Sequence, residues 1–283
     1  MIKNKKLLAV CLILCLSGIV VFYVIPFAAG IVDVFTVSSD SGAKAFGVDN
    51  FANLFQNSVF RVALKNTFVF TLVVVISVNV LSFIVAVIIK NLVNNSFLLS
   101  VIILPMTVPT IVIAAVFGDT LANQLTNIVN WFANSSVDLI RSGYAFILIV
   151  LIYLWKYTGF HTLVYIMALS IVPHDQYEAA SLDGASAWKK LRHITLPCIF
   201  PFICFNLLLA IMNSFKIFKD IYIIFGDYPP QNVYLLQHFI QNNFIKLNLD
   251  YVFSAAYVFL GILIIIFAPL IIKGNIAEDY YDE

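Results

Sequence analysis

Charged residues are scarce in this 283-residue chain: they make up 11% of the sequence, whereas 62% of the residues are apolar. Soluble domains contain about 25% charged and about 45–50% apolar residues. With 16 Lys and Arg against 15 Asp and Glu, neither sign of charge is in excess, which excludes a large nucleic-acid-binding surface. The composition excludes a water-soluble enzyme and is typical of a membrane protein.

Cysteine and phosphate-binding motifs are also rare or missing. The four cysteines, Cys11, Cys15, Cys198 and Cys204, lie in apolar stretches without a CxxC pair, so we expect small buried side chains and neither disulfides nor a metal site. The chain has no GxxxxGK[ST] motif, so we expect no bound cofactor. Residues 1–25 are too apolar over too great a length for a secretory signal, and we expect a retained span.

Long uncharged stretches are what the sequence does contain. Five gaps between charged residues hold 22 to 28 residues each, and a membrane-spanning helix needs about 20. A further gap, between Arg141 and Asp175, is interrupted only by Lys156. The segment 228–245 has two prolines and six Asn or Gln residues, which predict a loop with a short helix. The predicted spans are about 7–30, 66–89, 97–118, 145–171, 198–219 and 251–272.

These spans predict an all-α fold, a polytopic membrane protein with six transmembrane helices in a single domain over residues 1–283. Three lysines among the first six residues place the N-terminus in the cytoplasm by the positive-inside rule. An even number of spans then places the C-terminus there as well.

The predicted cytoplasmic loop 173–197 carries the clearest local signals. Pro173 ends the fourth span, and Asp175 with Glu178 predicts a capping box that starts a helix running from about Gln176 to Asp183. Gly184 predicts a left-handed turn after it.

A second helix, Ala185–Ile194, should follow, with Pro197 turning the chain back into the bilayer. Its Lys189, Lys190 and Arg192 are expected to meet anionic lipid headgroups. The small Ala179 and Ala180 in the first helix, beside Tyr177 and Leu182, leave a surface narrow enough to enter a groove of another protein.

Glu178-Ala179-Ala180, Gly184, and then Ile194 with Leu196-Pro197 resemble the EAA motif of ABC-type importer permeases. The segments FGVDNFANLF, LKNTFVFTL, ILPMTVPTIV, LWKYTGFHTLVYIMALSIVP and SFKIFKDIYIIFG resemble the carbohydrate-importing, maltose-type permeases of that group.

This resemblance implies a type I ABC importer permease in the bacterial inner membrane that works by alternating access and catalyses no reaction itself. Its implied partners are a second homologous permease, two ABC ATPases that bind ATP and Mg²⁺, and an extracellular solute-binding protein. The first helix of the loop would be the coupling helix that contacts an ATPase. Its contact residues would be Tyr177, Glu178, Ala179, Ala180, Leu182, Asp183 and Gly184.

A polar stripe on the fifth span is the candidate substrate path. Asn206, Asn213, Lys216 and Asp220 fall within about 80° of one another on a helix. Our hypothesis is that the two asparagines line a cavity and that Lys216 pairs with Asp220 near its outer mouth. The alternative is that the asparagines join helices by hydrogen bonds across the bundle.

Other features have mainly structural interpretations. Lys156 is expected to reach the membrane interface, in the outer half of the span or at a subunit contact, and His161 is expected to be a hydrogen-bonded residue inside the bundle. Pro105 and Pro109 predict a kink in the third span. The outer residues 33–61 and 225–249 are expected to receive the binding protein.

Three alternatives remain for the chain as a whole and for its motif. The importer could carry another solute, such as a peptide, an amino acid or a polyamine, although the lack of cations besides Lys216 along the path favours a neutral solute. A stand-alone secondary transporter would need intramembrane carboxylates, which the spans hold only at their edges. Glu178 could serve only to close the capping box.

Overall fold

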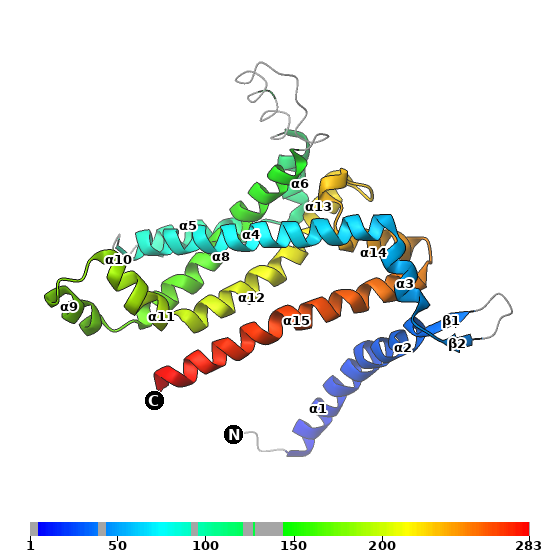
Figure 1. Ribbon diagram of the computed structural model, residues 1–283, viewed down its shortest axis with the longest axis horizontal. Coiled ribbons are helices and arrows are strands. Elements are labelled where there is room, and N and C mark those ends of the chain that lie inside the picture. Colours follow the sequence, from blue (N-terminus) through cyan, green and yellow to red (C-terminus); the bar gives the residue numbers. More distant parts are fainter. Residues whose placement is uncertain (1–4, 39–43, 92–95, 121–126, 128–143, 283) are drawn as a thin grey trace. The chain divides into compact units, whose positions relative to one another are not determined.

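The computed structural model describes residues 5–38, 44–91, 96–120, 127 and 144–282. They fall into two compact units, Met1–Arg61 with Phe239–Gly261, and Val62–His238 with Ile262–Glu283. Helices form almost all of the described structure, together with one small two-stranded antiparallel sheet (Figure 1). The predicted all-α membrane fold is confirmed.

The described part of the chain is a succession of helices with one pair of short strands. In order they are α1 (Lys5–Ile19), the π-helical η1 (Val20–Val24), α2 (Ile25–Val34), β1 (Thr36–Ser38), β2 (Lys44–Phe46), α3 (Asp49–Gln56), α4 (Ser58–Asn91), α5 (Ser96–Thr107), α6 (Thr110–Ala114), the π-helical η2 (Ala115–Thr120), α8 (Ala145–Ile171), α9 (His174–Leu182), α10 (Ala187–Lys190), the π-helical η3 (Leu191–Thr195), α11 (Leu196–Cys198), α12 (Phe200–Lys216), α13 (Phe218–Phe225), the 3₁₀ turn η4 (Gln231–Val233), α14 (Leu236–Ile245) and α15 (Leu249–Asp282).

Six segments of the described chain are long and apolar enough to cross a membrane when one bent pair is counted as a single span. The bent pair is α5 with the helical segment that begins at Thr110, and the two axes differ by 86°. Pro109 causes the break, because it is extended (φ −60°, ψ 142°) and immediately precedes α6. Pro105 stays inside α5, so the predicted kink lies at Pro109 alone.

Two spans are longer than the gaps between charges predict. The second begins at Ser58 because Arg61 and Lys65 lie on exposed positions of α4 and do not interrupt the helix. The fifth continues through α13 to Phe225, past Lys216 and Asp220. Counting charges underestimates a span wherever a charged side chain is exposed near its end or is paired inside the protein.

The larger unit has an apolar core formed by α4, α8, α12 and α13. Phe70 and Val74 of α4 pack with Ile149 and Tyr153 of α8 and with Ala210 of α12 in one buried cluster. Because helices in a membrane gain little from the hydrophobic effect, van der Waals packing of this kind is a main source of their association.

Helix α5 approaches α8 at Gly159. A Cβ atom on this glycine would clash with the carbonyl oxygen of Ile102 on α5. Only glycine allows two helix backbones to come so close, as in the small-residue contacts of other membrane helices. The glycine of the LWKYTGF segment therefore fixes the contact between the third and fourth spans.

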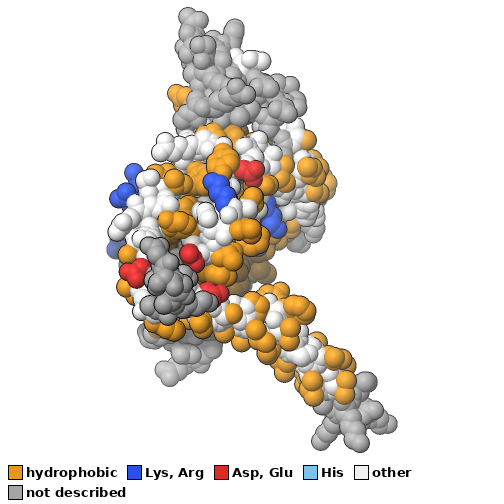
Figure 2. Space-filling model, turned by 90° about the vertical axis from the view of Figure 1, so that its right-hand side faces the viewer, with side chains coloured by type: hydrophobic (Ala, Val, Ile, Leu, Met, Phe, Trp, Pro, Cys, Tyr) orange, Lys and Arg blue, Asp and Glu red, His pale blue; other side chains and the backbone are white. Residues whose placement is uncertain are grey.

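In the smaller unit, the segment Val10–Val34 is strongly apolar, and none of its most apolar window is buried. Cys11 and Cys15 are consequently exposed, so the prediction that they are buried is wrong. Apolar side chains also lie over much of the described surface in Figure 2, and few charged side chains lie among them. A face of this kind is suited to lipid or to another membrane helix.

Asn50, in the FGVDNFANLF segment, fixes the connection that follows α2. Its side chain is buried, and its Nδ2 atom donates to the carbonyl oxygens of Val34 (3.0 Å) and Thr36 (3.3 Å). These bonds satisfy backbone acceptors where α2 ends and β1 begins.

The segment 228–238 of the larger unit folds against the start of the second span. Asn66 Nδ2 donates to the carbonyl oxygens of Gln231 and Tyr234, and Thr67 Oγ1 accepts from the amide of Leu236. The predicted loop with a short helix is confirmed. All of residues 233–236 are buried, whereas Tyr228 is 66% exposed.

Candidate functional site

The connection between the fourth and fifth spans is a helical hairpin, residues 173–198. Its first limb, α9, ends at Gly184, whose φ of 73° confirms the predicted left-handed turn. The amide of Gly184 donates to Ser181 and that of Ala185 donates to Ala180. This pair of bonds is a Schellman motif, which fixes the direction in which the chain leaves the helix.

The predicted capping box at the start of α9 is wrong. Pro173, and not Asp175, occupies the N-cap position, so the helix begins at His174 and Asp175 lies in its first turn. Glu178 is then four residues from His174, and its Oε1 atom lies 3.1 Å from His174 Nδ1. Glu178 therefore does not cap the helix, which rules out the interpretation that it serves only in a capping box.

The second limb differs from the predicted single helix Ala185–Ile194. It comprises α10, capped by the side chain of Ser186, then η3 and α11. The wide π-turn precedes Pro197, which has no N–H to donate to a regular helix.

Side chains inside the hairpin connect its two limbs. The Tyr177 hydroxyl lies 2.7 Å from Thr195 Oγ1, and the Lys190 ammonium donates to Ser181 Oγ. Tyr177 also packs on the buried cluster that contains Tyr165 and Leu169 of α8. Its ring therefore points into the hairpin and anchors it to the fourth span.

The outer surface of α9 is free of intramolecular packing. Within this helix, all of which the structure describes, no residue is buried. Leu182 is 90% exposed, and the Glu178 side chain is 68% exposed. Of the seven predicted contact residues, Tyr177 and Ala180 are half-buried and the other five are exposed along α9 and at its left-handed end.

A chain of hydrogen bonds runs through the interior of the larger unit. Asn79 Oδ1 on α4 accepts from the Tyr165 hydroxyl (2.8 Å) and from Asn206 Nδ2 (3.2 Å). His161 lies between two asparagines: its Nδ1 is 2.6 Å from Asn206 Oδ1, and its Nε2 is 3.5 Å from Asn213 Nδ2. The expectation that His161 is a hydrogen-bonded interior residue is confirmed.

This network, which we call the polar spine, connects α4, α8 and α12. His161 and Asn206 are completely buried, and Asn213 is 3% exposed. Within this chain Asn206 therefore joins helices, as the alternative interpretation of the asparagines states. Of the four predicted path residues, Lys216 is the exposed one, and its Nζ donates to Asn213 Oδ1.

The predicted pairing of Lys216 with Asp220 is wrong. Asp220 is fully buried and instead accepts from Lys156 Nζ at 3.0 and 2.9 Å. Lys156 is 8% exposed, so it does not extend to the membrane interface but connects α8 with α13. The charge that interrupts the fourth span is tolerated because its partner carboxylate comes from the next span.

Two members of the polar spine, Asn79 and Tyr165, were not predicted from the sequence. Asn79 is the one amide side chain between Lys65 and Lys90 besides Asn66, which follows Lys65 directly. A polar side chain this deep in an apolar span is itself a signal of a buried partner.

Comparison with protein families gives one match that covers most of the chain. The family described as "Binding-protein-dependent transport system inner membrane component" matches residues 79–276, a range that includes the hairpin, the polar spine and Lys156 with Asp220. The chain belongs to this permease family. It is a membrane transport permease and does not belong to an enzyme family.

Several curated members of this family are similar in sequence. The trehalose/maltose transport system permease protein MalF of Thermococcus litoralis is 32% identical over 145 residues, which are 50% of this chain and 49% of that protein. The arabinooligosaccharides transport system permease protein AraP of Bacillus subtilis is 30% identical over 75% of this chain and 70% of that protein. The chain thus spans about half the length of the first relative and a larger part of the second.

A solved structure shows the same permease fold over nearly the full length. A chain of a bacterial ABC transporter involved in the import of the acidic polysaccharide alginate superposes with a TM-score of 0.79, covering 97% of this chain and 96% of that chain at 20% identity. A second structure, of a bacterial alginate ABC transporter in complex with an alginate pentasaccharide-bound periplasmic protein, gives a TM-score of 0.74.

Proposed function

We propose that this chain is one of two membrane-spanning subunits of an ATP-driven, binding-protein-dependent carbohydrate importer. In this proposal it lies in the bacterial inner membrane with both termini in the cytoplasm and pairs with a homologous permease. Two ABC ATPases bind and hydrolyse ATP with Mg²⁺, and an extracellular binding protein delivers the sugar.

The observation that carries the proposal is the combination of an exposed α9 with a firmly anchored hairpin. Leu182 and Glu178 are exposed at the tip, whereas Tyr177 and Thr195 hold the base through a hydrogen bond. An exposed leucine on a short helix with small neighbours suits insertion into a groove of an ATPase subunit.

The anchoring also explains how movement of an ATPase would reach the membrane. Tyr177 packs on the cluster formed by Tyr165, Leu169 and Ala86, which belong to the fourth and second spans. A displacement of α9 would move these spans with it, because a closely packed cluster has little room to deform. The two permease subunits would then rock between outward-facing and inward-facing states.

The proposed solute is a neutral sugar or oligosaccharide. The two curated relatives described above carry the names of trehalose/maltose and arabinooligosaccharide systems, which are carbohydrate systems. Among the proposed path residues, Asp220 is neutralised by Lys156, so Lys216 is the one that retains an exposed charge. A path with so little free charge favours hydroxyl-rich neutral solutes over anions.

The test exchanges an exposed leucine for aspartate at each of two sites. Leu182→Asp places a charge on the proposed ATPase contact, and Leu247→Asp places the same charge on the outer loop, where Leu247 is 76% exposed. Aspartate also tolerates the positive φ of 58° at position 247. We expect Leu182→Asp to abolish co-purification of an ATPase with the tagged chain and Leu247→Asp to retain it.

Expression and elution volume of both variants should equal those of the unmodified chain, since neither leucine is buried. Retention of the ATPase by Leu182→Asp at the unmodified level would contradict the assignment of α9. Uptake of solute by vesicles that contain this chain alone would contradict the importer as a whole.

A further inference from the structure

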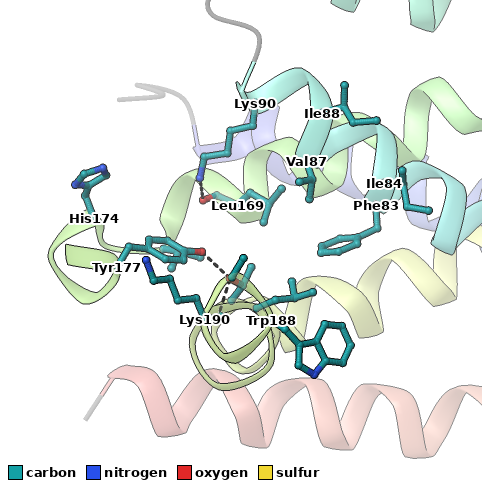
Figure 3. Close-up of a pocket in the computed structure, with 14 residues that line it drawn as sticks. Phe83, Ile84, Val87, Ile88, Lys90, Leu169, His174, Tyr177, Trp188 and Lys190 are labelled. Carbon is teal, nitrogen blue, oxygen red and sulfur yellow. Dashed lines mark hydrogen bonds between the residues drawn. The ribbon is translucent and has the colours of Figure 1, made fainter. Parts of the chain in front are cut away.

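A cavity of about 690 Å³ lies between the hairpin and the ends of the second and fourth spans. Phe83, Ile84, Val87 and Ile88 of α4 line one side, and Trp188 of α10 is among the residues across from them (Figure 3). These residues lie in the last turns of a candidate span or in the hairpin that follows, so we expect the cavity to lie where the membrane interior meets the headgroups.

The lining is apolar at one end and basic at the other. In the view of Figure 3, the nitrogen atoms of Lys90, Lys190 and His174 lie toward one end, and the rings of Phe83 and Trp188 lie toward the other. Among the described residues that line the cavity, three are basic and none is a carboxylate.

Each lysine is held by one hydrogen bond from its ammonium group to an acceptor in the described part of the chain. The Lys90 ammonium donates to the Leu169 carbonyl oxygen at 2.6 Å, and the Lys190 ammonium donates to Ser181 Oγ. An ammonium group has three N–H donors, so each lysine has capacity for a further acceptor. His174 is already paired with Glu178, which leaves the two lysines as the cations available to an anion.

We propose that this cavity binds one anionic phospholipid of the adjacent leaflet. Its phosphate lies between Lys90 and Lys190, and one acyl chain lies along Phe83 and Val87. The exposed indole of Trp188, a side chain that prefers the membrane interface, covers the glycerol region. The proposal depends on the position of the cavity at the membrane boundary and not on the identity of the solute or the ATPase.

The charge pattern favours a lipid over a protein segment. A single phospholipid combines an apolar chain with a phosphate at one end, which matches the two ends of the cavity. Ile84 and Ile88 are 49% and 52% exposed, so the cavity is open along a lipid-facing side of α4 through which an acyl chain can enter.

The experiment uses quenching of Trp188 fluorescence by brominated lipid. Trp131→Phe and Trp155→Phe leave Trp188 as the one tryptophan of the full chain, because the sequence has three. The protein is reconstituted in bilayers of phosphatidylcholine with increasing fractions of brominated phosphatidylglycerol or brominated phosphatidylcholine. We expect the anionic lipid to quench at the lower mole fraction, with each cavity lysine contributing about fivefold to the preference.

Two variants and one control test the site. Lys90→Gln with Lys190→Gln keeps hydrogen-bonding groups but removes the charges, and should bring the two lipids close to equal quenching. Lys189→Gln with Arg192→Gln removes two charges of the same basic segment outside the cavity and should largely keep the preference.

Filling the cavity gives an independent measurement. Val87→Phe should reduce quenching by both lipids, because the acyl chain loses its place. Equal quenching by the two lipids in the parent, an equal loss in the control, or full quenching in Val87→Phe would overturn the proposal. Protection of Trp188 from both lipids would indicate protein in the cavity and would also overturn it.

Discussion

The buried ion pair between Lys156 and Asp220 allows a quantitative test of the packing of the fourth and fifth spans. Two unit charges at about 3 Å attract by roughly 5 kcal/mol at an effective dielectric constant of 20. The side chains are 9% and 0% exposed, so water cannot replace a missing partner. Each of Lys156→Met and Asp220→Leu should therefore lower the free energy of unfolding by about 3–5 kcal/mol.

The double variant should recover most of the lost stability, because replacing both charges by apolar side chains of similar size is often neutral. The measurement is a denaturant titration of the reconstituted chain, monitored by circular dichroism, for the four members of the cycle. Lys219→Met is the matched control: this exposed lysine precedes Asp220 directly, and its loss should cost less than about 0.5 kcal/mol. Additive single effects in the double variant would refute the buried pair.

Three further predictions concern other parts of the larger unit and their controls. Gly159→Ala should lower the yield and thermal stability of the folded chain, because the added Cβ meets the backbone of α5. The control Gly261→Ala should be tolerated, because nothing lies within 4 Å of a Cβ at that position. Equal stability of the two variants would contradict the close contact. Burial lowers the pKa of His238 to about 4, against the opposing effect of the Asp227 charge. Because the folded pKa lies below the unfolded value of about 6.5, the unfolded state binds more protons as the pH falls, and stability should drop by about 2 kcal/mol from pH 7 to pH 5. In unfolding titrations, His238→Gln should reduce this dependence of stability on pH. An unchanged pH dependence would show that other groups cause it. In a chain without its four cysteines, Lys216→Cys should react with a charged thiol reagent and Asn206→Cys should not. The reason is that Lys216 is exposed and Asn206 is completely buried. Labelling of both cysteines would place the polar spine on a water-filled path.

Much of the fold could be predicted from the sequence, because the bilayer imposes simple rules on length and charge. Six spans followed from uncharged gaps, and the turn at Gly184 followed from the need for a residue that accepts positive φ. The exact ends of the spans could not be predicted from charge alone, since Arg61 is exposed on a continuing helix and Asp220 is paired inside the protein.

The partners of the polar side chains were the part that the sequence could not provide. Angular position on a helix placed Asn206, Asn213, Lys216 and Asp220 on one face, but a face says nothing of which helix covers it. Asp220 pairs with Lys156 of another span, although Lys216 lies one helical turn away on the same span as Asp220. At the hairpin, Pro173 occupies the N-cap position, so the helix begins nearer the N-terminus than predicted and Glu178 does not form the predicted capping box.

The interior contacts together bear on how the hairpin could act. The polar spine connects α4, α8 and α12 through His161 and Asn206, Lys156 with Asp220 adds α13, and Gly159 adds α5. Since neither spine nor ion pair can open without leaving a buried polar group unsatisfied, these helices should move as one body. A small displacement of α9 would then reach the far ends of the spans undiminished. In the proposed importer, weakening the interior contacts should therefore uncouple ATP hydrolysis from transport while leaving attachment of the ATPase intact.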